Sequence, residues 1–236
     1  MNNYQMNYGQ AYQSPVAVQN MVAAAMKRVY LNMFLGLLVT AVVSLLCVSS
    51  YSVMEFMLTK RFVMLGLVVV ELGLVIGISS AINRISNATA MLLFFLFAAV
   101  NGLMLAPIFL IYTGASIAKT FFITAGTFGA MSIYGYTTNA DLSKIGHILM
   151  MALIGLIIAA VVNMFMQSEQ FDYIISFIGI IIFVGLTAWD TQKIKKMAEV
   201  MPADQVGRLA TLGALSLYLD FINLFLYLLR FFGDRK

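Results

Sequence analysis

Seven apolar stretches of about 20 residues follow one another along the chain, with short hydrophilic segments between them. A helix of that length crosses the hydrocarbon core of a bilayer, and it satisfies its backbone hydrogen bonds internally. The stretches are Val29–Ser49, Phe62–Ile82, Ala88–Ile111, Ile117–Tyr136, Ile145–Met166, Tyr173–Gln192 and Leu209–Phe232. The sequence therefore predicts an all-α integral membrane protein with seven transmembrane helices.

The charged residues support this class and exclude others. They make up 10% of the chain, against about 25% in soluble domains. The formal net charge is +4, but the 14 basic residues are spread over many loops and form no nucleic-acid patch. The expected partner is thus the lipid bilayer, with no nucleic acid. One cysteine and one histidine give no cluster for zinc or haem, so no cofactor is expected.

The hydrophilic segments suggest the domain boundary and the topology. Residues 1–24 are expected to form a disordered polar tail, and residues 25–236 a single transmembrane domain. Lys193, Lys195 and Lys196 form the densest basic cluster, and the positive-inside rule places it in the cytoplasm. The N-terminus is then cytoplasmic as well. The short chain suits a bacterial inner membrane.

Two aspartates within the last two apolar stretches are the strongest functional signal. Asp190 lies near the end of the sixth stretch, and Asp220 lies ~16 Å into the last one if that helix begins at Leu209. A carboxylate at such a depth costs about 3 kcal/mol on insertion scales. If the two groups meet, they cannot both stay ionised cheaply, so they would share a proton. They could also hold a hard cation such as Ca²⁺ through their oxygens.

Polar residues of the last stretch recur at a helical spacing. Gly213, Ser216, Asp220, Asn223 and Tyr227 are three or four residues apart and therefore share one face. Such a face should point to the protein interior or to a water-filled path. Ser216, Asn223 and Tyr227 are thus candidates to line that path, and a buried network that only joins helices remains the alternative.

Glu71 is a third acid in an apolar stretch. Its helical neighbours are apolar, so it should be neutral or paired with a group on another helix. We expect it to line or gate a path. The alternative is a protonated side chain that donates to a backbone carbonyl.

The residues around these acids resemble motifs of the Bax inhibitor-1 family, also called the transmembrane Bax inhibitor motif family. The segment SLYLDFINLFLYLLRFFG, residues 216–233, resembles the motif of the family's last helix, and WDTQKI, residues 189–194, resembles the end of the sixth. Glu71 in VVELGL resembles the acid of the second helix. The resemblance implies a last helix surrounded by the other six. It also implies a pH-sensitive calcium leak channel, not an enzyme, gated by a di-aspartyl sensor of Asp190 and Asp220.

The resemblance further implies an arginine on the second helix that latches the aspartate of the sixth. The aligned position holds Ile82, and the nearest candidate for the latch is Arg84. Calcium and protons would be the ligands of the site, with Asp190 and Asp220 as the calcium-binding residues.

Three other functions use the same residues. A proton-coupled transporter would use the two carboxylates. The inverted repeat that is common in transporters is not visible in this sequence. A regulatory protein acting on a membrane protease or a cell-death partner is suggested by the family name alone. An intramembrane aspartyl protease would need Tyr-Asp and Gly-x-Gly-Asp sequences, and neither is found at Asp190 or Asp220.

Overall fold

The computed structural model describes residues 15–236, all of whose long elements are helices. In chain order the elements are α1 (Pro15–Val48), α2 (Tyr51–Thr59), α3 (Arg61–Ala81), α4 (Asn87–Leu105), α5 (Ile108–Ile111), α6 (Gly114–Thr137), α7 (Ser143–Met166), α8 (Glu169–Val200), the short 3₁₀ helix η1 (Ala203–Gln205) and α9 (Val206–Phe232). The all-α prediction is confirmed.

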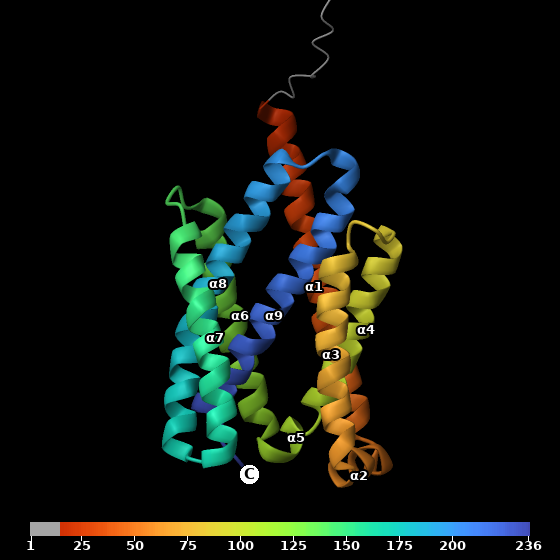
Figure 1. Ribbon diagram of the computed structural model, residues 1–236, viewed down its shortest axis with the longest axis vertical. Helices are drawn as coiled ribbons and strands as arrows, with labels where there is room; N and C mark the ends of the chain where they lie inside the picture. The colour runs from red at the N-terminus through yellow and green to blue at the C-terminus, as the bar shows by residue number, and fades with distance from the viewer. Residues whose placement is uncertain (1–14) are drawn as a thin grey trace, which may run out of the picture.

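Seven of these helices, α2 and α5 excepted, are arranged as membrane spans. Within the described residues six spans, α1, α3, α4 extended through α5, α7, α8 and α9, are long and apolar enough to cross a bilayer. Helix α6 has 24 residues and is not among these six. It starts at the end of the bundle where α4 finishes and ends where α7 starts (Figure 1), so it crosses as well.

Side-chain caps mark where several helices begin. Ser86, Thr113 and Ser168 each accept a backbone N–H three residues later, at 3.1, 3.2 and 3.3 Å, at the starts of α4, α6 and α8. Such caps satisfy donors that a helix start leaves free. At the other end of α4, the helix stops at Leu105 because Pro107 cannot continue the hydrogen-bond ladder.

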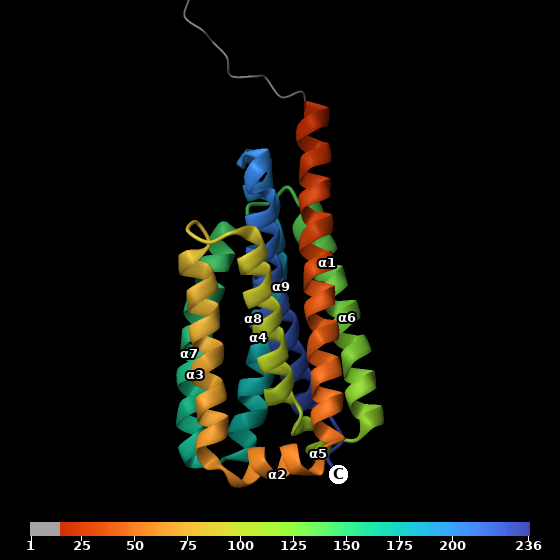
Figure 2. The same ribbon diagram turned by 90° about the vertical axis from the view of Figure 1, so that its right-hand side faces the viewer.

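Helix α9 is the centre of the bundle, as expected for the last helix. In its most apolar window 67% of residues are buried inside the protein, against 6% for α3 and 11% for α7. Its neighbours are mainly α8, α1, α6 and α4, whereas α7 packs on α8 and α3 packs on α4 (Figures 1 and 2). The last helix is therefore central, with four helices around it and two further out.

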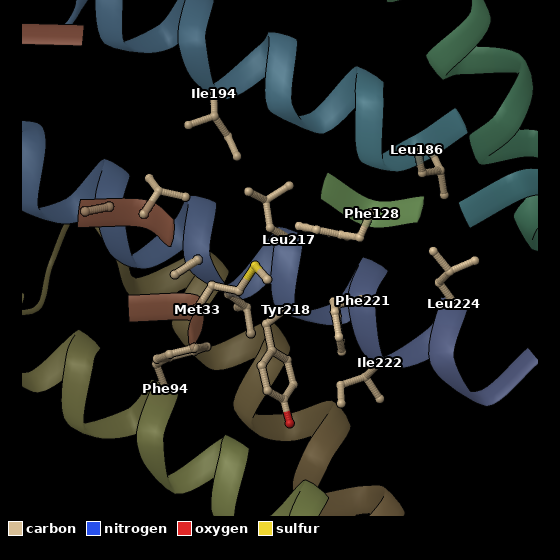
Figure 3. Close-up of a cluster of buried hydrophobic side chains, with 14 of the residues drawn as sticks. Met33, Phe94, Phe128, Leu186, Ile194, Leu217, Tyr218, Phe221, Ile222 and Leu224 are labelled. Atoms are coloured by element: carbon tan, nitrogen blue, oxygen red, sulfur yellow. The ribbon is translucent and has the colours of Figure 1, made fainter. Parts of the chain in front are cut away.

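The core follows from this arrangement. Figure 3 shows side chains of α9 pointing to several sides of the helix: Leu217 towards Ile194 of α8, and Tyr218 away from it. Met33 of α1, Phe94 of α4 and Phe128 of α6 belong to the same buried cluster. A helix that is buried all round must meet an apolar neighbour on every side.

Three boundaries differ from the predictions. Residues 15–24 form the first turns of α1 instead of a disordered tail, and residues 1–14 lie outside the described part of the chain. The segment Tyr51–Thr59 is a helix, α2, that lies across one end of the bundle (Figure 2). Helix α8 continues to Val200, so Lys193 lies on a helix and not in a loop.

Candidate site between the last two helices

Helices α8 and α9 form the most extensive pairing in the fold, and their register places the two aspartates. Gly179 lies against the ring of Tyr227, and Gly213 lies against the side chain of Ile194. Because the helices run antiparallel, Asp190 lies near the level of Ser216. Asp220 then lies about one turn, ~5–6 Å, further along α9.

Asp220 is the more deeply buried of the two. Its side chain is 5% exposed, and its Oδ2 atom has no hydrogen-bond partner within residues 15–236. The charged groups that act on it are Asp190 and Lys193. A buried carboxyl oxygen without a partner is rare in folded proteins and requires an explanation.

Asp190 is only partly buried and borders a cavity of ≈ 310 Å³ between α3, α8 and α9. Polar side chains in the wall are Asp190, Lys193, Ser216 and Ser79. The Ser216 hydroxyl is also close to the Asp190 carboxyl. Ser216, a candidate to line a path, thus lies at the cavity beside Asp190, and its role stays a prediction.

Lys193 is a functional candidate that the sequence did not single out. It lies one turn after Asp190 on the same helix, its charge acts on both carboxyls, and its ammonium lies 4.9 Å from the centre of the Trp189 ring. The signal in the sequence is the i, i+3 spacing of Lys193 from Asp190, which places both side chains on one helical face. The predicted helix ends at Gln192, so Lys193 falls outside it.

Two close helix contacts hold the part of α8 that carries Asp190. A side chain at Gly135 of α6 would collide with the carbonyl of Ala188, and one at Gly146 of α7 would collide with the Trp189 ring. Gln192 accepts a hydrogen bond from Leu142 N–H at 2.9 Å and donates to the carbonyl of Ala140 at 2.8 Å. The backbone around Asp190 is therefore held by α6, α7 and the loop between them.

Glu71 has found a partner on another helix, one of the two outcomes expected. Asn101 of α4 donates its Nδ2–H to Glu71 Oε1 at 2.8 Å. Asn101 is 8% exposed, and its Oδ1 atom has no partner among the described residues. A lone asparagine in the apolar segment AAVNGLML was the signal for this pair.

A second polar group of α9 lies on the side facing α1 and α4. The hydroxyl of Tyr218 lies 2.6 Å from Thr40 Oγ1, which also donates to the carbonyl of Ala98 at 2.8 Å. The rings of Phe94 and Phe97 contact Tyr218 edge-on. This group is enclosed and hydrogen-bonded.

The remaining predicted residues lie apart from the acidic pair. Asn223 is partly buried and donates to the carbonyl of Leu219 in its own helix at 2.8 Å. Tyr227 stacks on Phe183, with ring centroids 5.8 Å apart. Arg84 is exposed in the turn after α3, and Ile82 is buried. The cation beside the pair is therefore Lys193, and the structure shows no contact between Arg84 and Asp190.

The site offers few ligands for a tightly bound metal. Within the part of the chain that the structure describes, no group of three or more His, Cys, Asp or Glu side chains could hold a metal ion. Calcium prefers six to eight oxygens. The two aspartates and Ser216 could supply only part of such a shell.

These features define the class: a polytopic α-helical membrane protein with a central last helix and an acidic pair between its last two spans. The sequence model of the family described as "Inhibitor of apoptosis-promoting Bax1" matches residues 22–236. The chain therefore belongs to the Bax inhibitor-1 family, and the resemblance is confirmed.

Known relatives come from several bacteria. The chain is 50% identical to the inner membrane protein YbhL of Escherichia coli over 214 residues, which cover 89% of this chain and 92% of YbhL. It is 46% identical to a protein of Borreliella burgdorferi over 211 residues, 89% of this chain and 91% of that one. A membrane protein of Streptococcus pyogenes is 35% identical over 208 residues, 87% and 90% of the two chains.

Proposed function

We propose that this protein is a calcium leak channel whose conductance depends on the protonation of Asp190 and Asp220. The observation that carries the proposal is the pairing itself. The carboxyl of Asp190 on α8 is close enough to that of Asp220 on α9 for its charge to act on it, and one oxygen of Asp220 is buried without a partner among the described residues. A pair that only joined the helices would be expected to satisfy its polar atoms.

The charge on the pair supplies the switch. When both groups are ionised they repel each other, and only Lys193 offers a nearby compensating charge. When a proton is shared, the repulsion disappears and so does much of the attraction for a cation. The contact between α8 and α9 would therefore differ between the two states, with Lys193 in place of the arginine that the family resemblance implies.

The residues between the cavity and the other end of the bundle support a route for the ion. Val75 and Ser79 of α3 line the cavity, and Glu71 lies on the same helical face at an i, i+4 spacing. Asn223 of α9 follows the cavity residue Leu219 in the same way. A carboxyl and an amide thus continue from the cavity towards the other end of the bundle.

Calcium suits this arrangement as a passing ion. Two carboxylates give it hard oxygen ligands, and water would complete its shell because the described residues provide too few others. An incomplete site binds weakly, and conduction requires that the ion leave again.

We also propose the bacterial inner membrane as the location, with the N-terminus in the cytoplasm. The relative YbhL is named an inner membrane protein. Helix α8 finishes at the end of the bundle where α1 begins (Figure 1), and Lys193, Lys195 and Lys196 lie in the last turns of α8. The positive-inside rule favours the cytoplasm for that end.

The proposal is tested by calcium influx into proteoliposomes at pH 6, 7 and 8. Wild type should show a pH-dependent leak, and the Asp190→Asn and Asp220→Asn variants should lose that dependence. Flux no greater than in empty liposomes at every pH would refute the channel. Unchanged pH dependence in both variants would refute the sensor.

A second readout comes from Trp189, the one tryptophan of the chain, which adjoins Asp190. Its fluorescence should change between pH 6 and 8 in wild type and not in Asp220→Asn. His147 lies beside the Trp189 ring, 6.2 Å away centre to centre. His147→Gln is therefore the control, and it should keep the change if the aspartates cause it.

A further inference from the structure

A second cavity lies at the opposite end of α9 from the acidic pair. Its volume is ≈ 380 Å³. Two arginines, Arg230 and Arg235, line it together with Tyr112, and the rest of the wall is apolar, with Ile111 and Leu229 among its residues. The cavity thus combines two guanidinium groups with a hydrophobic surface.

Backbone hydrogen bonds hold the last residues over this cavity. Thr113 N–H donates to the carbonyl of Asp234 at 3.2 Å, and Lys236 N–H donates to the carbonyl of Ile111 at 2.9 Å. Between these bonds Tyr112 and Arg235 form an antiparallel bridge. Residues that face each other in such a bridge point to the same side, so Tyr112 and Arg235 both reach the cavity.

A further bond secures this segment. Asp234 N–H donates to Ser116 Oγ at 2.9 Å, and Ser116 is 4% exposed. Gly233 lies so close to the Tyr112 ring that a side chain there would meet it at 2.8 Å. Arg235 is therefore placed by a packed and hydrogen-bonded backbone.

The two arginines keep donors available. Arg230 uses one N–H on Asp172, at 3.2 Å, and a guanidinium has five. Within residues 15–236 the Arg235 side chain has no hydrogen-bond or ion-pair partner. The carboxylate of Asp234 is exposed beside it. Arg230 and Arg235 are the charged side chains in the lining of the cavity, and neither Asp172 nor Asp234 is part of that lining.

We propose that this cavity binds the headgroup of an anionic phospholipid, with the phosphodiester between Arg230 and Arg235. Guanidinium groups bind phosphate oxygens through strong charge-assisted hydrogen bonds. Tyr112 can add its hydroxyl. One acyl chain lies along the apolar wall at Ile111, which is 49% exposed.

The apolar wall favours a lipid over a soluble anion. A free phosphate would leave the surface of Ile108, Ile111 and Leu229 uncovered, whereas an acyl chain covers it. The site also lies where α9 ends, at Phe232, which is 56% exposed. Lipid headgroups are found at this level of a spanning helix.

Native mass spectrometry of the purified full chain tests the proposal. Phosphatidylglycerol and phosphatidylcholine with identical acyl chains are added in equal amounts, and retained lipid is counted for each variant. Arg235→Gln removes one charge from the cavity, and Tyr112→Phe removes only a hydroxyl. Lys60→Gln is the matched control, because Lys60 is exposed at the same end of the bundle (Figure 2) and does not line the cavity.

We expect wild type and Lys60→Gln to retain phosphatidylglycerol in preference to phosphatidylcholine. In Arg235→Gln that preference should fall about tenfold, the loss of one charge-assisted contact, with a smaller fall in Tyr112→Phe. Equal retention of the two lipids by wild type would overturn the proposal. An equal loss in Lys60→Gln and Arg235→Gln would overturn it too, as a general charge effect.

Inorganic phosphate and soluble glycerophosphate form the last arm of the experiment. At concentrations equal to that of the lipid, they should not displace phosphatidylglycerol. Displacement by either would show a site for a free anion and would overturn the lipid assignment.

Discussion

Tyr218 and Asp220 lie two residues apart on α9, and their side chains point to different sides of the helix, about 160° apart. Tyr218 faces α1 and α4. Its hydroxyl is paired with Thr40 at 2.6 Å, and its ring is 0% exposed. Asp220 faces α8. It is almost as buried, at 5%, but one of its oxygens has no partner in the described chain.

The contrast separates a structural polar group from a candidate functional one. A hydroxyl that is buried and fully paired makes a helix contact specific without a second state. A buried carboxyl that is close to another carboxyl and incompletely bonded has two states that differ in charge. We therefore expect substitutions at Tyr218 and Thr40 to affect stability, and substitutions at Asp220 to affect function.

The largest effect on stability is expected for Thr40→Val. This change keeps the shape of the side chain but leaves the Tyr218 hydroxyl buried without its partner. The expected loss is roughly 1–3 kcal/mol of unfolding free energy. Thermal unfolding in detergent measures it.

The double variant Thr40→Val with Tyr218→Phe is the control. It removes both polar groups, so it should be less destabilised than the sum of the single variants. If the two effects simply add, the hydrogen bond is not what joins these helices.

Substitutions at Glu71 test whether this residue is a structural polar group or a functional one. Glu71→Leu leaves Asn101 Nδ2 without an acceptor and should cost about 1–2 kcal/mol. Glu71→Gln keeps an acceptor and should change stability by less than ~0.5 kcal/mol. We expect calcium influx to fall in Glu71→Gln all the same, because the carboxylate is lost from the proposed route. Unchanged influx would mean that Glu71 is a structural polar group, as Tyr218 is.

The spans were predictable because membrane length and hydropathy are local properties of the sequence. The acids Asp190, Asp220 and Glu71 stood out for the same reason, since ionisable groups are conspicuous in apolar stretches. The partner of Glu71 was not predictable, because Asn101 is 30 residues away and only the packing of α3 on α4 brings the two together.

The predicted helix boundaries are wrong where a polar segment of the sequence was expected to end a helix. Lys193, Lys195 and Lys196 were assigned to a loop, but long side chains let a helix continue into water, and α8 runs on to Val200. Likewise, the sequence predicts a polar tail over residues 1–24, but residues 15–24 form the start of α1. Helix α2 was missed because its nine residues are too short to give a spanning signal.

A smaller change in stability is expected for Asp220→Asn. The variant has nearly the same shape and no charge, so it should be as stable as wild type or more stable by up to ~1 kcal/mol. Thermal unfolding at pH 8 measures this. A clear loss of stability would mean that the carboxylate is a structural group like Tyr218, and the contrast between the two sides of α9 would fail.

The smallest effect is expected for Asp141, an acid outside the spans in the loop before α7. The ammonium of Lys196, 2.7 Å away, lowers the pKa of this carboxyl to about 2. The contribution of this ion pair is therefore complete above the ordinary pKa near 3.8 and is lost only as the pH falls through about 2. Its charge does not change between pH 6 and 8.

Asp141→Asn should thus leave the ratio of calcium influx at pH 6 to that at pH 8 unchanged, while Asp220→Asn abolishes the difference. Both variants replace an aspartate by an asparagine, one at the exposed Asp141 and the other at the buried Asp220. If Asp141→Asn also removed the pH dependence, the response would come from charges at the membrane surface acting on the pore. The pair between α8 and α9 would then not be the sensor.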